Sequence, residues 1–282
     1  MHDSQLKQQP KVISKDSKAR PQQLWTVNCE LKKGVIRMDF QYVVGRNPVL
    51  EVLKTDREIE KLYVLKGELQ GSINKIIGMA KDRNIIIQQV DKNKLDSLSE
   101  GNAHQGVVAL VTSYNYVDID DILNRAKERN QPPFIVILDG LEDPHNLGSI
   151  IRSAECAGVH GVIIPKRRSA QVNQTVYKSS AGAVEHMLVA KVSNIVNAIE
   201  ELKDKGLWIY GADMDGTDYH YKTSLQGAIA LVIGNEGKGL SRLVKEKCDV
   251  LVKIPMLGQI SSLNASNAAA ILIYEVVRQN HG

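Results

Sequence analysis

Apolar and polar positions follow two alternating patterns along most of the chain. From Tyr42 onward, short apolar runs are separated by longer segments whose apolar residues recur at spacings of three and four. The first pattern is typical of buried strands and the second of amphipathic helices; one clear helical face is Ile73, Ile76, Ile77 and Ala80. Strands that alternate with helices predict an α/β fold with a parallel sheet covered on both faces.

The longest series of these elements lies in the second half. Strands are predicted at 134–139, 161–164, 187–190, 208–212, 228–233 and 250–254, and helices at 149–157, 171–180, 195–205, 241–247 and 264–278.

The same patterns divide the chain into four parts. A small α/β domain is predicted over 41–112, and a larger one over 134–282. Between them, residues 113–133 lose the apolar alternation and are predicted to form a linker with one charged helix. Residues 1–37 are rich in Gln, Lys and Ser with little apolar periodicity, which predicts a basic, disordered extension.

The net charge of +4 is unevenly distributed. Residues 1–37 carry eight Lys and Arg against three Asp and Glu, so the remaining chain has a net charge of about −1. An overall basic body is thereby excluded, and any attraction to phosphate must come from the extension and from local patches.

No apolar run is long enough for a membrane span, and the amino terminus is polar where a secretory signal needs an apolar core. Three cysteines without CxxC spacing indicate reduced thiols and no zinc site. We therefore expect a cytoplasmic protein.

Three polar loops each follow a predicted strand. They span 140–148, 234–241 and 254–267. Ligands of open α/β sheets bind beyond the carboxyl ends of the strands, so the three loops predict one composite site.

Common motifs do not account for these loops. Gly237-Lys238 suggests a P-loop, but that spacing needs Gly at 232 and Ser or Thr at 239, where Val232 and Gly239 stand. No nucleophile elbow surrounds Ser261 or Ser262, and at least one of these serines is expected to cap the last helix.

Two further polar segments keep simpler interpretations. His145 beside Asp143 is better explained as part of a turn than as a metal ligand. Lys166-Arg167-Arg168 either binds phosphates or is a solvated charge run, and the sequence leaves both open.

Taken together, the segments 139–154, 233–240 and 254–266 resemble the three motifs of the SpoU family. This family, in the SPOUT superfamily, comprises RNA ribose 2'-O-methyltransferases. The resemblance covers about 150 residues, with matching order, spacing and position after strands. It implies a deep trefoil knot that forms the S-adenosylmethionine pocket, a homodimer, and no requirement for a metal.

The segment 41–112, with His104-Gln105-Gly106-Val107 near its end, resembles the RNA substrate-binding domain of many members, which is similar in fold to small ribosomal proteins. The pairing implies methylation of a guanosine ribose in large-subunit (23S) ribosomal RNA. Transfer RNA or another ribosomal RNA nucleotide is the alternative substrate. A non-catalytic RNA-binding ribosome assembly factor is the alternative of a different class. Neither DNA nor a membrane is expected as a partner.

The resemblance also assigns roles to residues. The implied cofactor contacts are Gly234, Ile254, Met256, Leu263 and Gly182. The implied catalytic residues are Asn146, Arg152, Glu236, Ser262 and Asn264.

Arg152 is the residue often proposed as the base in relatives. The pKa of an arginine lies above about 12, so its deprotonation at neutral pH costs roughly 7 kcal/mol. We therefore expect Arg152 to act as a charged clamp on the target phosphate and developing alkoxide, with Glu236 fixing Arg152 or accepting the proton.

Overall fold

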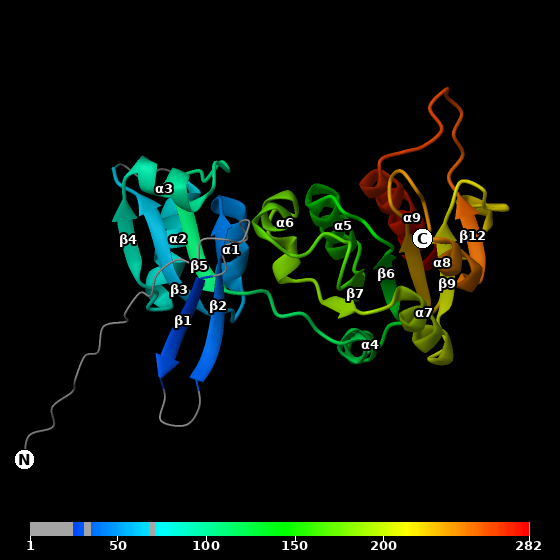
Figure 1. Ribbon diagram of the computed structural model, residues 1–282, viewed down its shortest axis with the longest axis horizontal. Helices are drawn as coiled ribbons and strands as arrows, with labels where there is room; N and C mark the ends of the chain where they lie inside the picture. The colour runs from blue at the N-terminus through cyan, green and yellow to red at the C-terminus, as the bar shows by residue number, and fades with distance from the viewer. Residues whose placement is uncertain (1–24, 31–34, 68–70, 282) are drawn as a thin grey trace, which may run out of the picture. The chain divides into compact units, whose positions relative to one another are not determined.

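The computed structural model describes residues 25–30, 35–67 and 71–281, which contacts divide into two units. The first unit contains the described residues up to Arg46 together with Asp56–Tyr114. The second contains Asn47–Thr55 and Asn115 onward (Figure 1). Among the described helices, none is long and apolar enough to cross a bilayer.

The described part of the first unit holds a five-stranded sheet in the order β1-β2-β5-β3-β4. Only β3 and β4 pair in parallel. The elements are β1 Trp25–Glu30, β2 Val35–Val44, β3 Ile59–Leu65, α2 Ser72–Asp82, β4 Ile87–Val90, α3 Lys92–Leu98 and β5 Val107–Thr112. The helical face predicted for α2 is confirmed, since Ile73, Ile76 and Ala80 are buried.

Two elements of this unit differ from the sequence predictions. The extension predicted as disordered over 1–37 contains all of β1 and the start of β2, so the prediction is wrong for 25–30 and 35–37. These segments pair antiparallel with each other, which composition does not reveal. The rest of the extension lies outside the described residues. Helix α3 was not predicted; Asp91 caps it by accepting a hydrogen bond from the Lys94 N–H at 2.9 Å.

The second unit, in its described part, is built on a seven-stranded sheet in the order β10-β12-β9-β11-β6-β7-β8. Every pairing is parallel, as predicted. The strands are β6 Phe134–Leu138, β7 Gly161–Pro165, β8 Val189–Val192, β9 Trp208–Ala212, β10 Asp218–Tyr219, β11 Ile229–Ile233 and β12 Val250–Lys253. The central strands β6 and β11 are buried along their whole length. The deep trefoil knot stays a prediction.

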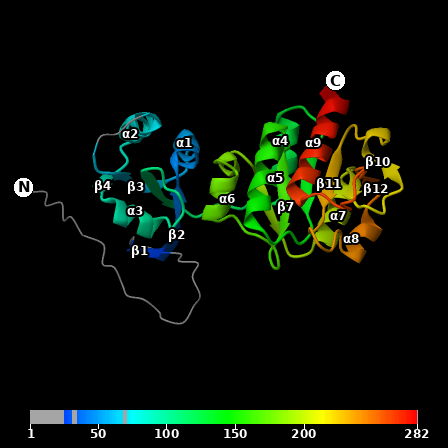
Figure 2. The same cartoon turned by 90° about the horizontal axis from the view of Figure 1, so that it is seen from above.

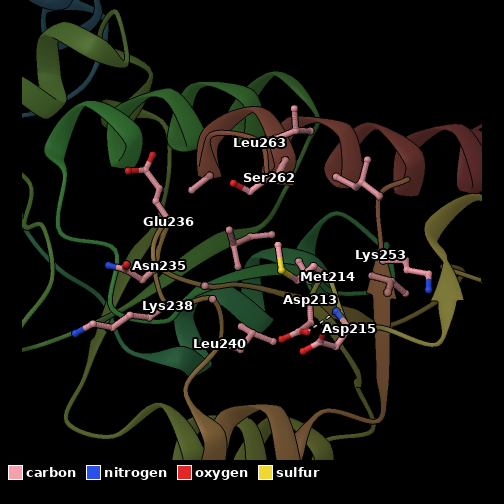
Figure 3. A pocket seen from close by; sticks show the side chains of 18 of the residues that line it. Asp213, Met214, Asp215, Asn235, Glu236, Lys238, Leu240, Lys253, Ser262 and Leu263 are labelled. Atoms are coloured by element: carbon pink, nitrogen blue, oxygen red, sulfur yellow. Dashed lines mark hydrogen bonds between the residues drawn. The ribbon is translucent and has the colours of Figure 1, made fainter. Parts of the chain in front are cut away.

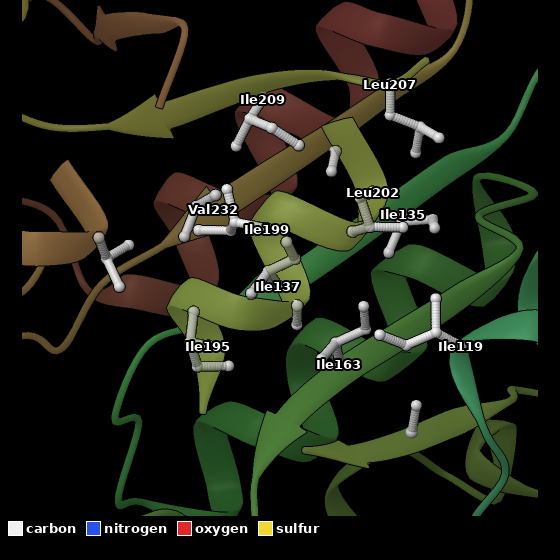
Figure 4. Packing of buried hydrophobic residues seen from close by; sticks show 14 of the residues in the cluster. Ile119, Ile135, Ile137, Ile163, Ile195, Ile199, Leu202, Leu207, Ile209 and Val232 are labelled. Atoms are coloured by element: carbon white, nitrogen blue, oxygen red, sulfur yellow. The ribbon is translucent and has the colours of Figure 1, made fainter. Parts of the chain in front are cut away.

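Helices cover both faces of this sheet (Figure 1). They are α4 Ile119–Glu128, α5 Pro144–Cys156, α6 Gln174–Ser179, α7 Ile195–Asp204, α8 Arg242–Lys247 and α9 Ala265–His281; contacts also assign most of α1 Arg46–Lys54 to this unit. Helices α4, α7 and α8 pack on the sheet side chains of one face, among them Ile137, Ile163 and Val232 (Figure 4). Helices α5 and α9 lie side by side on the opposite face (Figure 2).

The segment predicted as a linker over 113–133 is part of this second unit from Asn115 onward. Its helix, α4, buries Ile119, Ile122 and Ala126, at spacings of three and four, against the sheet. An apolar face of this kind needs a partner surface, so the segment is a packed element and not only a connection.

Helix α5 begins at Pro144, five residues before the predicted start at 149. Proline at the first helical position and an Asp143 carboxylate that accepts a hydrogen bond from the His145 N–H at 2.9 Å define this start. The earlier start places Asn146 in the first turn of α5, where it is buried.

Candidate functional site

A cavity of about 510 Å³ lies at the carboxyl ends of β9, β11 and β12 (Figure 3). Two of the three predicted loops, those after β11 and β12, form much of its wall. Of the residues that the sequence singled out, the cavity is lined by Gly234, Glu236, Ile254, Met256, Ser262 and Leu263. Four of the five predicted cofactor contacts are therefore brought together.

The loop after β11 is a tight turn that only glycine permits at its first position. Asn235 and Gly239 exchange backbone hydrogen bonds of 3.0 and 2.8 Å. A Cβ on Gly234 would lie 2.3 Å from the Gly239 carbonyl carbon and 2.4 Å from its oxygen. Because these are backbone atoms, no side-chain movement could relieve the overlap.

The third predicted loop joins this turn through hydrogen bonds. The Asn235 side-chain amide donates to the carbonyl of Gly140 at 2.9 Å. Asp139 accepts from the Ser241 N–H at 2.7 Å. The loops after β6 and β11 are thus held together, as the position of their strands in the sheet predicts.

Three predicted catalytic side chains form one hydrogen-bonded group, here called the amide–carboxylate network. Glu236 accepts a hydrogen bond from the amide of Asn146 and a second, at 2.7 Å, from the amide of Asn264. The amide of Asn264 also donates to the side-chain oxygen of Asn146 at 3.0 Å. Asn146 is only 5% exposed, while Glu236 also lines the cavity, so the network connects the buried end of α5 with the cavity wall.

The start of α9 fixes the orientation of Asn264. Its side-chain oxygen accepts from the backbone N–H and the hydroxyl of Ser266, at 2.9 and 2.6 Å, which leaves its amide group facing the network. Asn264 therefore caps α9. The prediction that Ser261 or Ser262 caps this helix is wrong; both are exposed and line the cavity instead.

Two predicted site residues stand apart. Arg152 lies on an exposed face of α5, and within the described residues it has neither an ion pair nor a hydrogen bond, so Glu236 does not hold it. Gly182 follows α6 with a φ of 91°, a backbone conformation that glycine readily adopts, and it does not line the cavity.

One further segment of the cavity wall was missed by the sequence analysis. It follows β9 and consists of Asp213, Met214 and Asp215 (Figure 3). Lys245 donates to the carboxylates of Asp213 and Asp215 at 2.8 and 3.2 Å, and the bond to Asp213 raises the pKa of Lys245. Polar residues directly after a predicted strand at 208–212 are the signal that could have revealed it.

Comparisons with known proteins agree with this arrangement. The model of the SpoU rRNA methylase family matches residues 133–274, and the model of the RNA 2'-O ribose methyltransferase substrate-binding domain matches residues 42–117. The putative TrmH family tRNA/rRNA methyltransferase YacO of Bacillus subtilis is 48% identical over 85% of this chain and 96% of its own length. A putative TrmH family tRNA/rRNA methyltransferase of Staphylococcus aureus is also 48% identical, over 86% of this chain and 98% of its own length.

Solved structures show the same likeness. The SpoU methyltransferase AviRb from Streptomyces viridochromogenes, in complex with the cofactor AdoMet, has a TM-score of 0.71 and 28% identity, covering 85% of this chain and 90% of its own. A crystal structure of an RNA 2'-O ribose methyltransferase has a TM-score of 0.70 at 25% identity, over 85% and 88% of the two chains.

The matches to both family models, over the sheet domain and over the substrate-binding domain before it, identify an RNA 2'-O-ribose methyltransferase. The chain belongs to the SpoU rRNA methylase family. The resemblance drawn from the sequence motifs is confirmed.

Proposed function

We propose that this protein methylates the ribose 2'-hydroxyl of a guanosine in 23S ribosomal RNA of the large subunit, with S-adenosylmethionine as methyl donor. The observation that carries the proposal is the amide–carboxylate network, which joins three segments at the wall of a cavity large enough for a small cofactor. The substrate-binding family model over residues 42–117 supports an RNA of defined structure as the substrate.

The cavity suits a cofactor of this kind. Leu240, Met256, Leu263 and Leu272 offer apolar walls, and the Gly234 turn lets backbone groups approach a ligand closely. Bound S-adenosylmethionine would supply an electrophilic methyl group on a sulfonium. The AdoMet-bound structure of AviRb supports this cofactor.

The protein's own part in the reaction is mainly positioning. Transfer needs the hydroxyl oxygen, the methyl carbon and the sulfur in line, and such positioning can lower a barrier by about 7 to 11 kcal/mol. Asn146 and Asn264 hold the Glu236 carboxylate in place, and Ser262 lies at the same wall, where its hydroxyl can orient the ribose. Glu236 accepts the proton of the reacting hydroxyl.

Arg152 acts as the charged clamp. It is exposed and carries no protein partner among the described residues, so its guanidinium is available to a phosphate or a developing alkoxide. The acceptor guanosine is unpaired, because its ribose has to enter a pocket and RNA is read specifically in single-stranded regions.

The active form is a homodimer in the cytoplasm. Ile271 and Tyr274 on α9 are 39% and 49% exposed, which supports a second copy of the chain as cover for this helix. Within one chain, neither Arg152 nor Gly182 lines the cavity, as expected if a second subunit completes the site.

The test is transfer of labelled methyl from S-adenosylmethionine to purified, unmodified 23S ribosomal RNA, with the position mapped afterwards. Label on one guanosine ribose of 23S ribosomal RNA is expected. Label on transfer RNA or on another nucleotide would show that the proposed RNA target is wrong, while the proposed methyl transfer to a ribose would stand. Failure of the protein to bind S-adenosylmethionine in calorimetry would favour the non-catalytic assembly factor.

A further inference from the structure

A cluster of cations lies at the carboxyl ends of β7 and β8, apart from the cavity. It consists of Lys166, Arg167 and Arg168, here called the basic turn, and of Lys191 within β8. Strands β6, β7 and β8 are neighbours and parallel, so the basic turn lies on the same edge of the sheet as the site loops. The sequence left open whether the turn binds phosphates.

The basic turn has a defined conformation. The N–H of Lys166 donates to Val192 at 2.8 Å, and the hydroxyl of Ser169 donates to the carbonyl of Pro165 at 2.7 Å. The amide of Gln171 donates to the same carbonyl at 3.0 Å and to the Ser169 hydroxyl at 2.9 Å. Arg168 adopts a left-handed φ of 54°. The cations therefore project from a folded turn.

This turn is attached to the loop that leads to Asn146. The N–H of Ala170, two residues after the basic turn, donates to the carbonyl of Leu141 at 2.7 Å. Leu141 is buried in the loop between β6 and α5. A hydrogen bond thus links the segment of the basic turn to the loop that leads into the amide–carboxylate network.

The four cations have no carboxylate partner in the part of the chain that the structure describes. Within the described residues, no ion pair involves Lys166, Arg167, Arg168 or Lys191. The ammonium of Lys191 lies 3.7 Å from the ring centroid of Tyr116, and burial and the charge of Lys166 both lower the pKa of Lys191. Neighbouring cations without counter-charges repel one another, and a bound anion would relieve that repulsion.

The basic residues near the amino ends of the strands differ. Lys203, Lys205 and Lys247, on or directly after α7 and α8, each lie within 4 Å of a carboxylate. Unpaired charge therefore distinguishes the basic turn and Lys191 from this group of lysines.

We infer that the basic turn and Lys191 bind the sugar–phosphate backbone of the substrate RNA beside the target nucleotide. The inference rests on the proposed RNA-methylating function and adds the surface that holds the strand. RNA supplies regularly spaced negative charges, and Lys and Arg contacts to phosphates add affinity that carries no sequence information. A solvated charge run would need no such attachment to the loop that leads to Asn146.

The test compares two triple variants with equal loss of charge. Lys166→Gln, Arg167→Gln and Arg168→Gln remove the basic turn; Lys203→Gln, Lys205→Gln and Lys247→Gln are the matched control. Binding of the mapped RNA substrate is measured over a series of salt concentrations, with methyl transfer and cofactor affinity measured in parallel. For single strands each phosphate contact contributes about 0.7 to the slope of log affinity against log salt, so a decrease of about 2 is expected for the basic-turn variant.

The expected result is at least a tenfold weaker affinity and a higher KM for RNA, with kcat at saturating RNA and cofactor affinity unchanged. Lys191→Met, which keeps the side-chain stem over Tyr116, is expected to give a smaller change in the same direction. If the basic-turn variant matched the control in affinity and salt slope while the wild type methylates RNA, the inference would be overturned. A wild type that methylates no RNA would refute the proposed function instead.

Discussion

The carboxyl edge of the parallel sheet has two parts of opposite character. Around β11 and β12, the amide–carboxylate network pairs its polar groups with one another, and the Gly234 turn leaves no room for a single additional carbon. Around β7 and β8, the basic turn presents cations that no carboxylate of the described residues balances. The polar groups of the first part form hydrogen bonds with one another, whereas the second part carries a net positive charge.

This difference indicates a division of labour. Groups that act on a reacting atom must hold their positions before the substrate arrives, which satisfied hydrogen bonds achieve. Groups that attract a polyanion need unbalanced charge and little positional accuracy. Changes in the first part should therefore reduce kcat or cofactor binding, and changes in the second should raise KM for RNA.

The largest expected effect comes from Arg152, which lies on α5 with Asn146 and, like the basic turn, has no ion-pair partner among the described residues. Arg152→Ala should lower kcat by about 10²–10³-fold or more, because a charged donor to the transition state is lost. Cofactor affinity, measured by calorimetry, should stay within about twofold. Arg242→Ala, at an exposed cation paired with Glu246, is the control. Near-normal turnover of Arg152→Ala on the mapped RNA would show that Arg152 is not a catalytic residue.

Gly234→Ala should disrupt the tight turn after β11. The added carbon overlaps backbone atoms, and the forced movement should cost about 1–3 kcal/mol, which weakens cofactor binding roughly tenfold or more. Gly258→Ala is a matched control, since a Cβ at Gly258 would meet nothing within 4 Å. Equal cofactor affinity of the two variants in calorimetry would contradict the close packing of the turn.

Glu236→Gln tests the charge within the amide–carboxylate network. A hydrogen bond to an ionised acceptor is stronger than one to a neutral acceptor by about 1 kcal/mol, and Glu236 accepts two, so weaker positioning alone should lower turnover by about 30-fold. A much larger loss of kcat, with cofactor affinity preserved, would support Glu236 as the proton acceptor. Unchanged kcat would exclude both roles.

The smallest effect concerns Glu275, at the far end of α9 from Asn264. Hydrogen bonding from Arg278 lowers the pKa of Glu275 to about 2. Because the folded-state pKa is depressed, its stabilisation is present above the ordinary value near 4.5 and is lost as pH falls toward 2. Glu275→Gln should lower Tm by roughly 2–4 °C at pH 7, and the difference should shrink by pH 3 in calorimetric scans. A difference independent of pH would contradict this assignment.

Local signals in the sequence predicted most of the second unit. Strand β9 has the predicted bounds 208–212, and the other strands from β6 onward that were predicted lie within a few residues of their expected positions. Buried parallel strands are nearly continuous apolar runs, and this pattern survives in any tertiary context. The three motif loops followed from the strand ends.

Features that depend on tertiary partners were not predictable in this way. Strand β1 forms by pairing with β2. Asn264 caps α9 with its side-chain oxygen while its amide group donates to Asn146 in the network. Neither choice is visible in the local pattern of residues. The sequence at 166–168 likewise did not reveal the hydrogen bond from Ala170 to Leu141 that attaches the basic turn to its neighbouring loop.

The amide–carboxylate network also has a consequence for the order of folding. Asn264 and Asn146 are separated by 118 positions in the chain, and Asn146 and Glu236 by 90. Contacts between such distant positions form late, since the loops between them must close first. A chain still emerging from the ribosome lacks Asn264 until translation has passed this position, so the amide–carboxylate network forms only after the segment around Asn264 has been made.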